Sequence, residues 1–98
     1  MPGTPTVYIL ANKPRGTLYT GVTSQLVRRI WQHREGCADG FTKQYGVKQL
    51  VWYEQHRDMI NAITREKTIK RWPRKRKFDV IEKLNPGWED LWCRIVER

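Results

Sequence analysis

Short apolar runs separated by turn residues mark the first strands of the chain. Residues 7–10 form one such run, between Pro5 and a loop that is rich in proline and glycine. A second run, 17–22, is rich in residues that favour β-structure, and the intervening loop of about six residues suits an antiparallel hairpin. A third apolar run at residues 47–53 predicts another strand.

Helical spacing begins directly after the hairpin. Ser24 is a good N-cap, and a helix over residues 25–35 would end near Gly36. Residues 36–46 hold three glycines and several polar side chains, so they are predicted to form a loop. The apolar positions of the helix lie at helical spacing: Leu26, Val27, Ile30 and Trp31.

Two further helices are predicted after the third strand. Asp58 can cap a helix of about fourteen residues that ends at Pro73, because proline disfavours helical geometry in the residue before it. Another helix is predicted over residues 74–84, where Asn85-Pro86-Gly87 breaks it. The last residues are expected to add a helical turn or two over an edge of the core.

The order ββαβαα predicts an α/β domain of the α+β kind, with a small, three-stranded, mainly antiparallel sheet flanked by helices. A chain of 98 residues is long enough for one modest core. We therefore expect residues 1–98 to form a single domain, with its core at about 6–84 and a C-terminal extension at 85–98.

Basic residues dominate the charge. Nineteen Lys and Arg against ten Asp and Glu give a net charge of +9, and a field of that sign concentrates polyanions. The expected partner is a nucleic acid, DNA first, with RNA left open. No membrane association is expected, because no apolar run approaches the ~20 residues that a spanning helix needs.

Seven basic side chains lie within residues 67–77, and they predict a phosphate-binding surface unless they form only a solvated helix face. Arg28 on the first helix joins the candidate nucleic-acid contacts. Four of the tryptophans are expected to pack in the core or as a lid rather than to stack on bases. The basic cluster consists of Lys67, Lys70, Arg71, Arg74, Lys75, Arg76 and Lys77, and the tryptophans are Trp52, Trp72, Trp88 and Trp92.

The N-terminus lacks the basic start and long apolar stretch of a secretory signal, so a cytoplasmic location is expected. Cys37 and Cys93 lie far apart, without CxxC spacing, and a reducing compartment would keep both as thiols. His33 and Cys37 have the spacing of half a zinc site, but no second pair at metal-ligand spacing accompanies them.

A carboxylate interrupts the apolar stripe of the helix after Asp58. Glu66 lies in the middle of that stripe, which also contains Met59, Ala62, Ile63 and Ile69. Burial of an unpaired charge costs several kcal/mol, so the group must be paired, lie at the rim of a cleft or bind a metal. A salt bridge or rim position and a functional carboxylate both remain open from periodicity alone.

Arg29 and His33 are four residues apart and therefore project from the same side of the first helix. They could contact phosphate or metal together. They could equally belong to a solvated basic face, since Arg28 and Arg34 are close by.

Two hairpin segments resemble the paired signature of the GIY-YIG nuclease superfamily, written here Thr6-Val7-Tyr8 and Tyr19-Thr20-Gly21. The resemblance covers roughly residues 6 to 93 and looks like the small bacterial members related to the N-terminal nuclease domain of the excinuclease ABC system. Its later segments keep the order of that family: Arg28-Arg29 with His33, Gly40-Phe41-Thr42, Val51-Trp52-Tyr53-Glu54 and Arg65-Glu66-Lys67.

The resemblance implies a role for each matching residue. Tyr8 and Tyr19 would line the active site with their hydroxyls, one of them helping to deprotonate the attacking water. Arg29 would stabilise charge on the scissile phosphate, and His33 matches a histidine found in many members. Glu66 matches the single carboxylate that holds the metal.

Two further positions complete the match. Gly21 is the signature glycine, which allows close approach of neighbouring groups. Asn85 is a candidate for a late asparagine of the family. The chain departs from the signature where Thr6 replaces its first glycine and where Val7 and Thr20 replace its isoleucines.

Phosphodiester hydrolysis needs a nucleophilic water, a cation that neutralises the phosphate oxygens, and stabilisation of the leaving oxygen. Glu66 with Mg²⁺ or Mn²⁺ would supply the cation, since magnesium commonly uses one or two carboxylates and keeps several waters. Arg29 can donate two hydrogen bonds to phosphate, which lysine cannot. A tyrosine with an unperturbed pKa of ~10 is a weak base at neutral pH and needs help from the metal, Arg29 or His33.

The expected function is a metal-dependent endonuclease acting on DNA that is branched, damaged or single-stranded, in repair or recombination. The alternative is a catalytically silent nucleic-acid-binding module on the same scaffold. A protein partner that supplies targeting is a third interpretation, because the chain leaves no room for a separate recognition domain.

Overall fold

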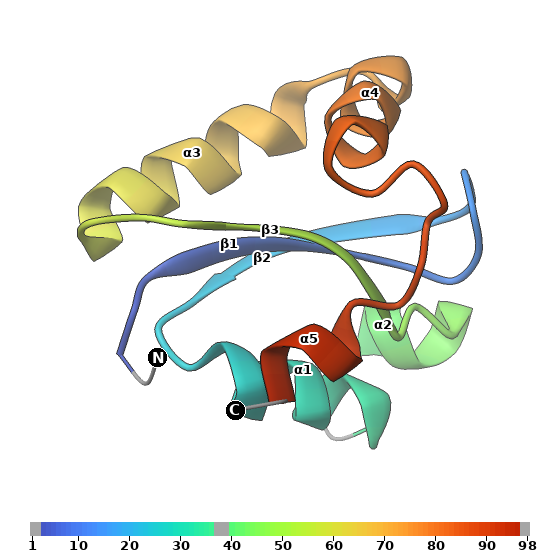
Figure 1. Ribbon diagram of the computed structural model, residues 1–98, viewed down its shortest axis with the longest axis horizontal. Helices are drawn as coiled ribbons and strands as arrows, with labels where there is room; N and C mark the ends of the chain where they lie inside the picture. The colour runs from blue at the N-terminus through green and yellow to red at the C-terminus, as the bar shows by residue number, and fades with distance from the viewer. Residues whose placement is uncertain (1–2, 37–39, 97–98) are drawn as a thin grey trace.

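The computed structural model describes residues 3–36 and 40–96, and its centre is an antiparallel sheet (Figure 1). The sheet contains β1 (Thr6–Ala11), β2 (Leu18–Thr23) and β3 (Gln49–Gln55) in the order β2-β1-β3. All six residues of β1 are buried, which suits a central strand covered on both faces. β2 is therefore an edge strand, and it pairs with β1 from Thr6 opposite Thr23 to Ala11 opposite Leu18.

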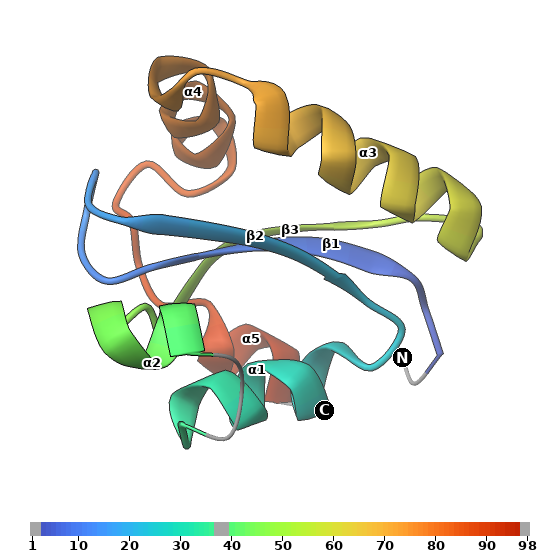
Figure 2. The ribbon, with the colours of Figure 1, turned by 180° about the vertical axis from the view of Figure 1, so that it is seen from behind.

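Helices cover both faces of this sheet, as Figures 1 and 2 show from opposite sides. One face carries α3 (Met59–Arg71) and α4 (Arg74–Leu84), and the other carries α1 (Leu26–Arg34), α2 (Gly40–Tyr45) and α5 (Trp92–Val96). The expected α+β class, with three antiparallel strands flanked by helices, is confirmed.

Alternation along β1 divides the core between the two layers. Val7 and Ile9 pack in the cluster of α3 and α4, whereas Tyr8 and Leu10 pack in the cluster of α1 and α5. The four tryptophans expected to pack do so: Trp52 and Trp88 are buried in the core, and Trp72 and Trp92 lie partly buried against it. The Tyr8 side chain therefore lies on the α1 side of the sheet, and the core side chains that pack with α3 lie on the opposite side.

The prediction of a loop over residues 36–46 is wrong for residues 40–45, which form α2. Tertiary contacts stabilise this six-residue helix: Thr42 is buried, its carbonyl accepts a hydrogen bond from the amide of Val47, and its hydroxyl lies 3.1 Å from His33 Nδ1. Gly46, with φ of 63°, ends it. Cys37, the other half of the suggested zinc pair, lies outside the described residues.

The first helix differs from expectation in its cap and its buried face. Gln25 rather than Ser24 occupies the N-cap, without a side-chain cap hydrogen bond. Val27 and Trp31 are 44% and 49% exposed, whereas Ile30 and His33 are buried. Of the predicted stripe, Leu26 and Ile30 pack against the core, and this short helix buries the polar His33 together with them.

The ends of α3 follow the prediction. The Asp58 side chain accepts a hydrogen bond of 2.8 Å from the amide of Asn61, and Trp72, just before Pro73, is extended. The expected C-terminal turns are α5, which packs beside α1 (Figure 1). No helix among the described residues is long and apolar enough to cross a membrane.

Glu82 of α4 connects the hairpin loop to the C-terminal segment. Its carboxylate accepts hydrogen bonds from Arg15 at 2.8 and 2.9 Å and from the indole of Trp88 at 2.7 Å. These donors lower the pKa of the Glu82 carboxyl from 4.5 to about 2. A depressed carboxyl pKa adds stability above the unfolded pKa, and this stability is lost as the pH falls through the folded one.

We therefore expect the Tm of the native protein to fall on acidification from about pH 5 to about pH 3 more steeply than that of a Glu82→Gln variant. Asp79→Asn is the control, since Asp79 lies on the same helix and its ion pair with Lys75, at 3.4 Å, is exposed. Equal acid slopes for native protein and Glu82→Gln in scanning calorimetry would contradict the expectation.

Candidate active site

Tyr8 and Gly21 face each other across the β1–β2 ladder. A Cβ atom added to Gly21 would lie 2.4 Å from the Tyr8 hydroxyl oxygen and 2.5 Å from the carbon that bears it. The phenol ring therefore passes directly over the backbone of β2, a position that only glycine permits. The signature glycine is thus needed to position the first signature tyrosine.

His33 holds the hydroxyl end of the Tyr8 side chain from α1. Its Nε2 lies 3.0 Å from the Tyr8 hydroxyl, and its Nδ1 lies 3.1 Å from the hydroxyl of Thr42 on α2. His33 is only 1% exposed, and these contacts engage both ring nitrogens. It therefore positions Tyr8 and does not form part of a solvated basic face.

Arg29, one turn earlier on α1, approaches both signature tyrosines. Burial lowers the pKa of its guanidinium, but hydrogen bonding and electrostatic interaction with Tyr8 and Tyr19 outweigh this and raise that pKa above its ordinary value. A guanidinium can only donate hydrogen bonds, so the phenol oxygens act as acceptors toward it.

Tyr19 connects this cluster to a row of aromatic rings on α2. Its ring centroid lies 6.4 Å from that of Tyr8, 5.3 Å from that of His33 and 6.0 Å from that of Phe41. Phe41 in turn lies 5.0 Å from Tyr45 and is 42% exposed. The sequence reasoning assigned no role to Phe41 or Thr42, and their only signal was the Gly40-Phe41-Thr42 segment of the resemblance.

Glu66 reaches the same edge of the sheet from the other layer. It lies on α3, is 8% exposed, and forms an ion pair of 2.6 Å with the ammonium of Lys70. α3 packs on β1 and β2. The structure therefore gathers Tyr8, Tyr19, Arg29 and His33 on one side of β2, and Glu66 approaches this strand from α3 on the other side.

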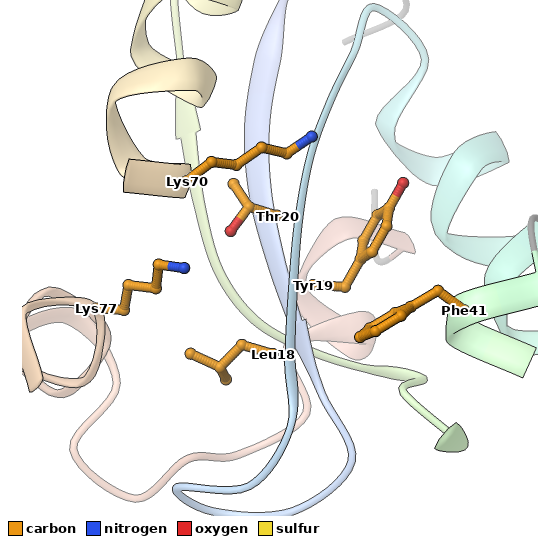
Figure 3. A pocket seen from close by; sticks show the side chains of 6 residues that line it. All are labelled: Leu18, Tyr19, Thr20, Phe41, Lys70 and Lys77. Carbon is orange, nitrogen blue, oxygen red and sulfur yellow. The ribbon is translucent and has the colours of Figure 1, made fainter. Parts of the chain in front are cut away.

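A cavity spans this edge strand. In Figure 3, Lys70 and Lys77 lie on one side of β2, and Tyr19 and Phe41 lie on the other. Lys70, the partner of Glu66, and Tyr19, the neighbour of Arg29, therefore line the same space. Glu66 and the tyrosines are therefore connected through Lys70 and Tyr19, which both line this cavity at the β2 edge.

The residues present fit a single hard divalent cation. No group of three or more His, Cys, Asp or Glu side chains gathers anywhere in the described parts of the chain. Magnesium can nevertheless be held by one carboxylate and several waters. The Lys70 ammonium already places a positive charge at Glu66, and it would have to move to admit a metal ion.

Two of the predicted nucleic-acid contacts also support the fold. Arg74 donates to the carbonyls of Arg15 and Gly16 at 3.0 and 2.9 Å and so holds the hairpin loop. Arg76 lies 4.4 Å above the Trp72 ring. The side chains of the other candidates remain exposed to solvent: Arg28, Lys67, Lys70, Arg71 and Lys75.

Asn85 is also structural. Its amide donates to the carbonyls of Val51 and Glu89 at 3.1 and 2.8 Å, and its side-chain oxygen accepts from the Glu89 amide. These bonds clamp the turn after α4 onto β3. The assignment of Asn85 to the site stays a prediction.

Residues 4–79 match the family model of the GIY-YIG catalytic domain. The chain belongs to the GIY-YIG family. A UPF0213 protein of Clostridium perfringens is 39% identical over 75 residues, which cover 76% of this chain and 80% of the relative. A UPF0213 protein of Desulfotalea psychrophila is 32% identical over 78 residues, covering 79% and 71% of the two chains.

A solved GIY-YIG relative has the same fold. The solution NMR structure of a UPF0213 protein from Bacillus halodurans superposes with a TM-score of 0.56 at 28% identity, covering 89% of this chain and 92% of that chain. Membership of the GIY-YIG family places the chain among nuclease-type domains and implies a nucleic acid substrate.

Proposed function

We propose that this GIY-YIG domain is a metal-dependent endonuclease that hydrolyses phosphodiester bonds in branched, damaged or single-stranded DNA. One observation carries the proposal: the half-buried guanidinium of Arg29 lies against the phenols of Tyr8 and Tyr19 at the open edge of the sheet. A fixed cation beside two hydroxyls is the arrangement that phosphoryl chemistry requires.

Each residue of the cluster has a distinct task in this proposal. Arg29 donates to the oxygens of the scissile phosphate, where charge builds in the transition state. Tyr8 and Tyr19 orient the phosphate and the attacking water through their hydroxyls, and His33 fixes the orientation of Tyr8. Glu66 would hold the divalent cation, which when bound polarises the phosphoryl group and lowers the pKa of a bound water.

Arg29→Lys tests the proposal against Arg28→Lys, its exposed neighbour on α1. Lysine keeps the charge but loses the forked donor geometry, so we expect Arg29→Lys to lower the cleavage rate of labelled DNA by about a hundredfold. Arg28→Lys should change it by less than about twofold. Equal effects of the two variants in Mg²⁺ or Mn²⁺ would overturn the assignment of Arg29.

The alternative is a domain that binds nucleic acid without cutting it, and the ion pair between Glu66 and Lys70 favours this interpretation, because it already neutralises the candidate metal ligand. Persistent DNA binding with no nicking in any divalent metal, at protein concentrations well above that of the substrate, would establish it. Nicking that disappears on chelation would exclude it.

A further inference from the structure

The cavity at the edge of β2 has a volume of about 420 Å³, within the range of ligand-binding pockets. Figure 3 shows the lysine ammonium groups on the α3 and α4 side and the aromatic rings on the α2 side. The side chain of Thr20, from β2, lies between the lysines and the aromatic rings. The lining residues are Leu18, Tyr19, Thr20, Phe41, Lys70 and Lys77.

Lys77 gives this cavity a fixed positive charge. Burial lowers the pKa of its ammonium, and the nearby charges of Arg74 and Lys70 lower it further. Lys70 and Lys75 each pair with a carboxylate one turn away, but in the described parts of the chain no carboxylate lies within ion-pair distance of Lys77. A half-buried ammonium among other cations is a place where an anion gains binding energy.

We propose that this cavity is a phosphate subsite, in which Lys77 and Lys70 bind a backbone phosphate of the nucleic acid close to the one that is cleaved. The proposal rests on the proposed function, which supplies the polyanion. The subsite lies close to the cleaved phosphate because the Tyr19 side chain lines the cavity and also contacts the Arg29 cluster. A strand lying along β2 would therefore present one phosphate to Arg29 and another to Lys77.

Lys70 couples this subsite to Glu66. Its ammonium lies 2.6 Å from the carboxylate in the structure, yet its side chain is 53% exposed and lines the cavity. A phosphate in the cavity competes with Glu66 for that ammonium. Occupation of the subsite thus frees the carboxylate to accept a divalent cation, so that substrate and metal favour each other's binding.

The subsite is tested by the binding of a short single-stranded oligodeoxynucleotide in buffer with a chelator, where no cleavage occurs. Lys77→Met is compared with Lys83→Met, which removes the same charge from an exposed position of the same helix that is not a candidate nucleic-acid contact. We expect Lys77→Met to weaken binding about tenfold and to reduce the salt dependence by about one phosphate contact. Lys83→Met should weaken it less than about twofold. Equal losses for the two variants would mean a diffuse basic surface and would overturn the subsite.

The coupling has a separate readout in the affinity for Mn²⁺ alone, measured by electron paramagnetic resonance of the free ion. Lys70→Met should tighten Mn²⁺ binding several-fold by removing the competing ammonium, and Glu66→Gln should abolish it. Unchanged or weaker Mn²⁺ binding in Lys70→Met would contradict the proposal that removal of the Lys70 ammonium frees Glu66 to bind the cation. Neither measurement depends on cleavage, so failure of the proposed nuclease activity is distinguishable from failure of the subsite.

Discussion

Replacing Glu66 with Gln should lower the rate of metal-dependent DNA cleavage by about a thousandfold or more, because the neutral amide is a far weaker ligand for a hard cation. Glutamine keeps the shape of the side chain. Its partner Lys70 is half-exposed and can turn to solvent, so the fold should survive. Single-turnover cleavage of labelled DNA in Mn²⁺, alongside a thermal unfolding curve, makes the measurement.

Glu54→Gln is the matched control. Glu54 is also paired, to Arg65 at 3.0 Å and to His56 at 2.7 Å, and it lies on β3, at the opposite edge of the sheet from β2. Its replacement should leave the cleavage rate within about twofold of native. Undiminished cutting by Glu66→Gln would remove the carboxylate from the mechanism, whatever the outcome for Arg29.

Gly21→Ala should lower the free energy of unfolding by on the order of 3 kcal/mol and also reduce cleavage strongly. The added methyl group would lie well inside contact distance of the Tyr8 phenol, which is buried and lies opposite Gly21 in the ladder. The ring must move, and its contacts with His33 and Arg29 move with it. Urea unfolding and cleavage kinetics on the same preparation measure both effects.

Gly40→Ala provides the comparison for that substitution. A Cβ atom at Gly40 meets no atom within 4 Å, and the residue begins a helix, where alanine is the better former. It should be neutral or slightly stabilising. A Gly21→Ala variant as stable as Gly40→Ala would show that β2 can shift away from Tyr8 and that the close approach is not required.

The site depends on an edge strand. β2 has a free side because the sheet order is β2-β1-β3, and this leaves room for a nucleic acid strand along it. The guanidinium and the phenols approach from one layer, and the carboxylate and the two lysines approach from the other. In the proposed function, cleavage takes place where these layers meet.

Sequence reasoning located the strands and the ends of α3 because the signals there are local. Apolar runs bounded by turn residues gave β1, β2 and β3 to within a few residues, and Asp58 and Pro73 mark helix boundaries through their own backbone chemistry. The same local pattern predicted an antiparallel hairpin, whereas the register that pairs Tyr8 with Gly21 is known only from the structure. The family resemblance rested on these same residues.

Tertiary structure decided what the local patterns left open. α2 has little helical signal of its own and depends on contacts of Thr42 with His33 and Val47. The burial of His33, and the use of Arg74 and Asn85 as clamps, depend on partners far away in sequence. Periodicity shows which side of a helix turns inward, but not which face of the sheet receives that helix. Glu66 and Tyr8 thus lie on opposite sides of the sheet, because α1 and α3 cross opposite faces.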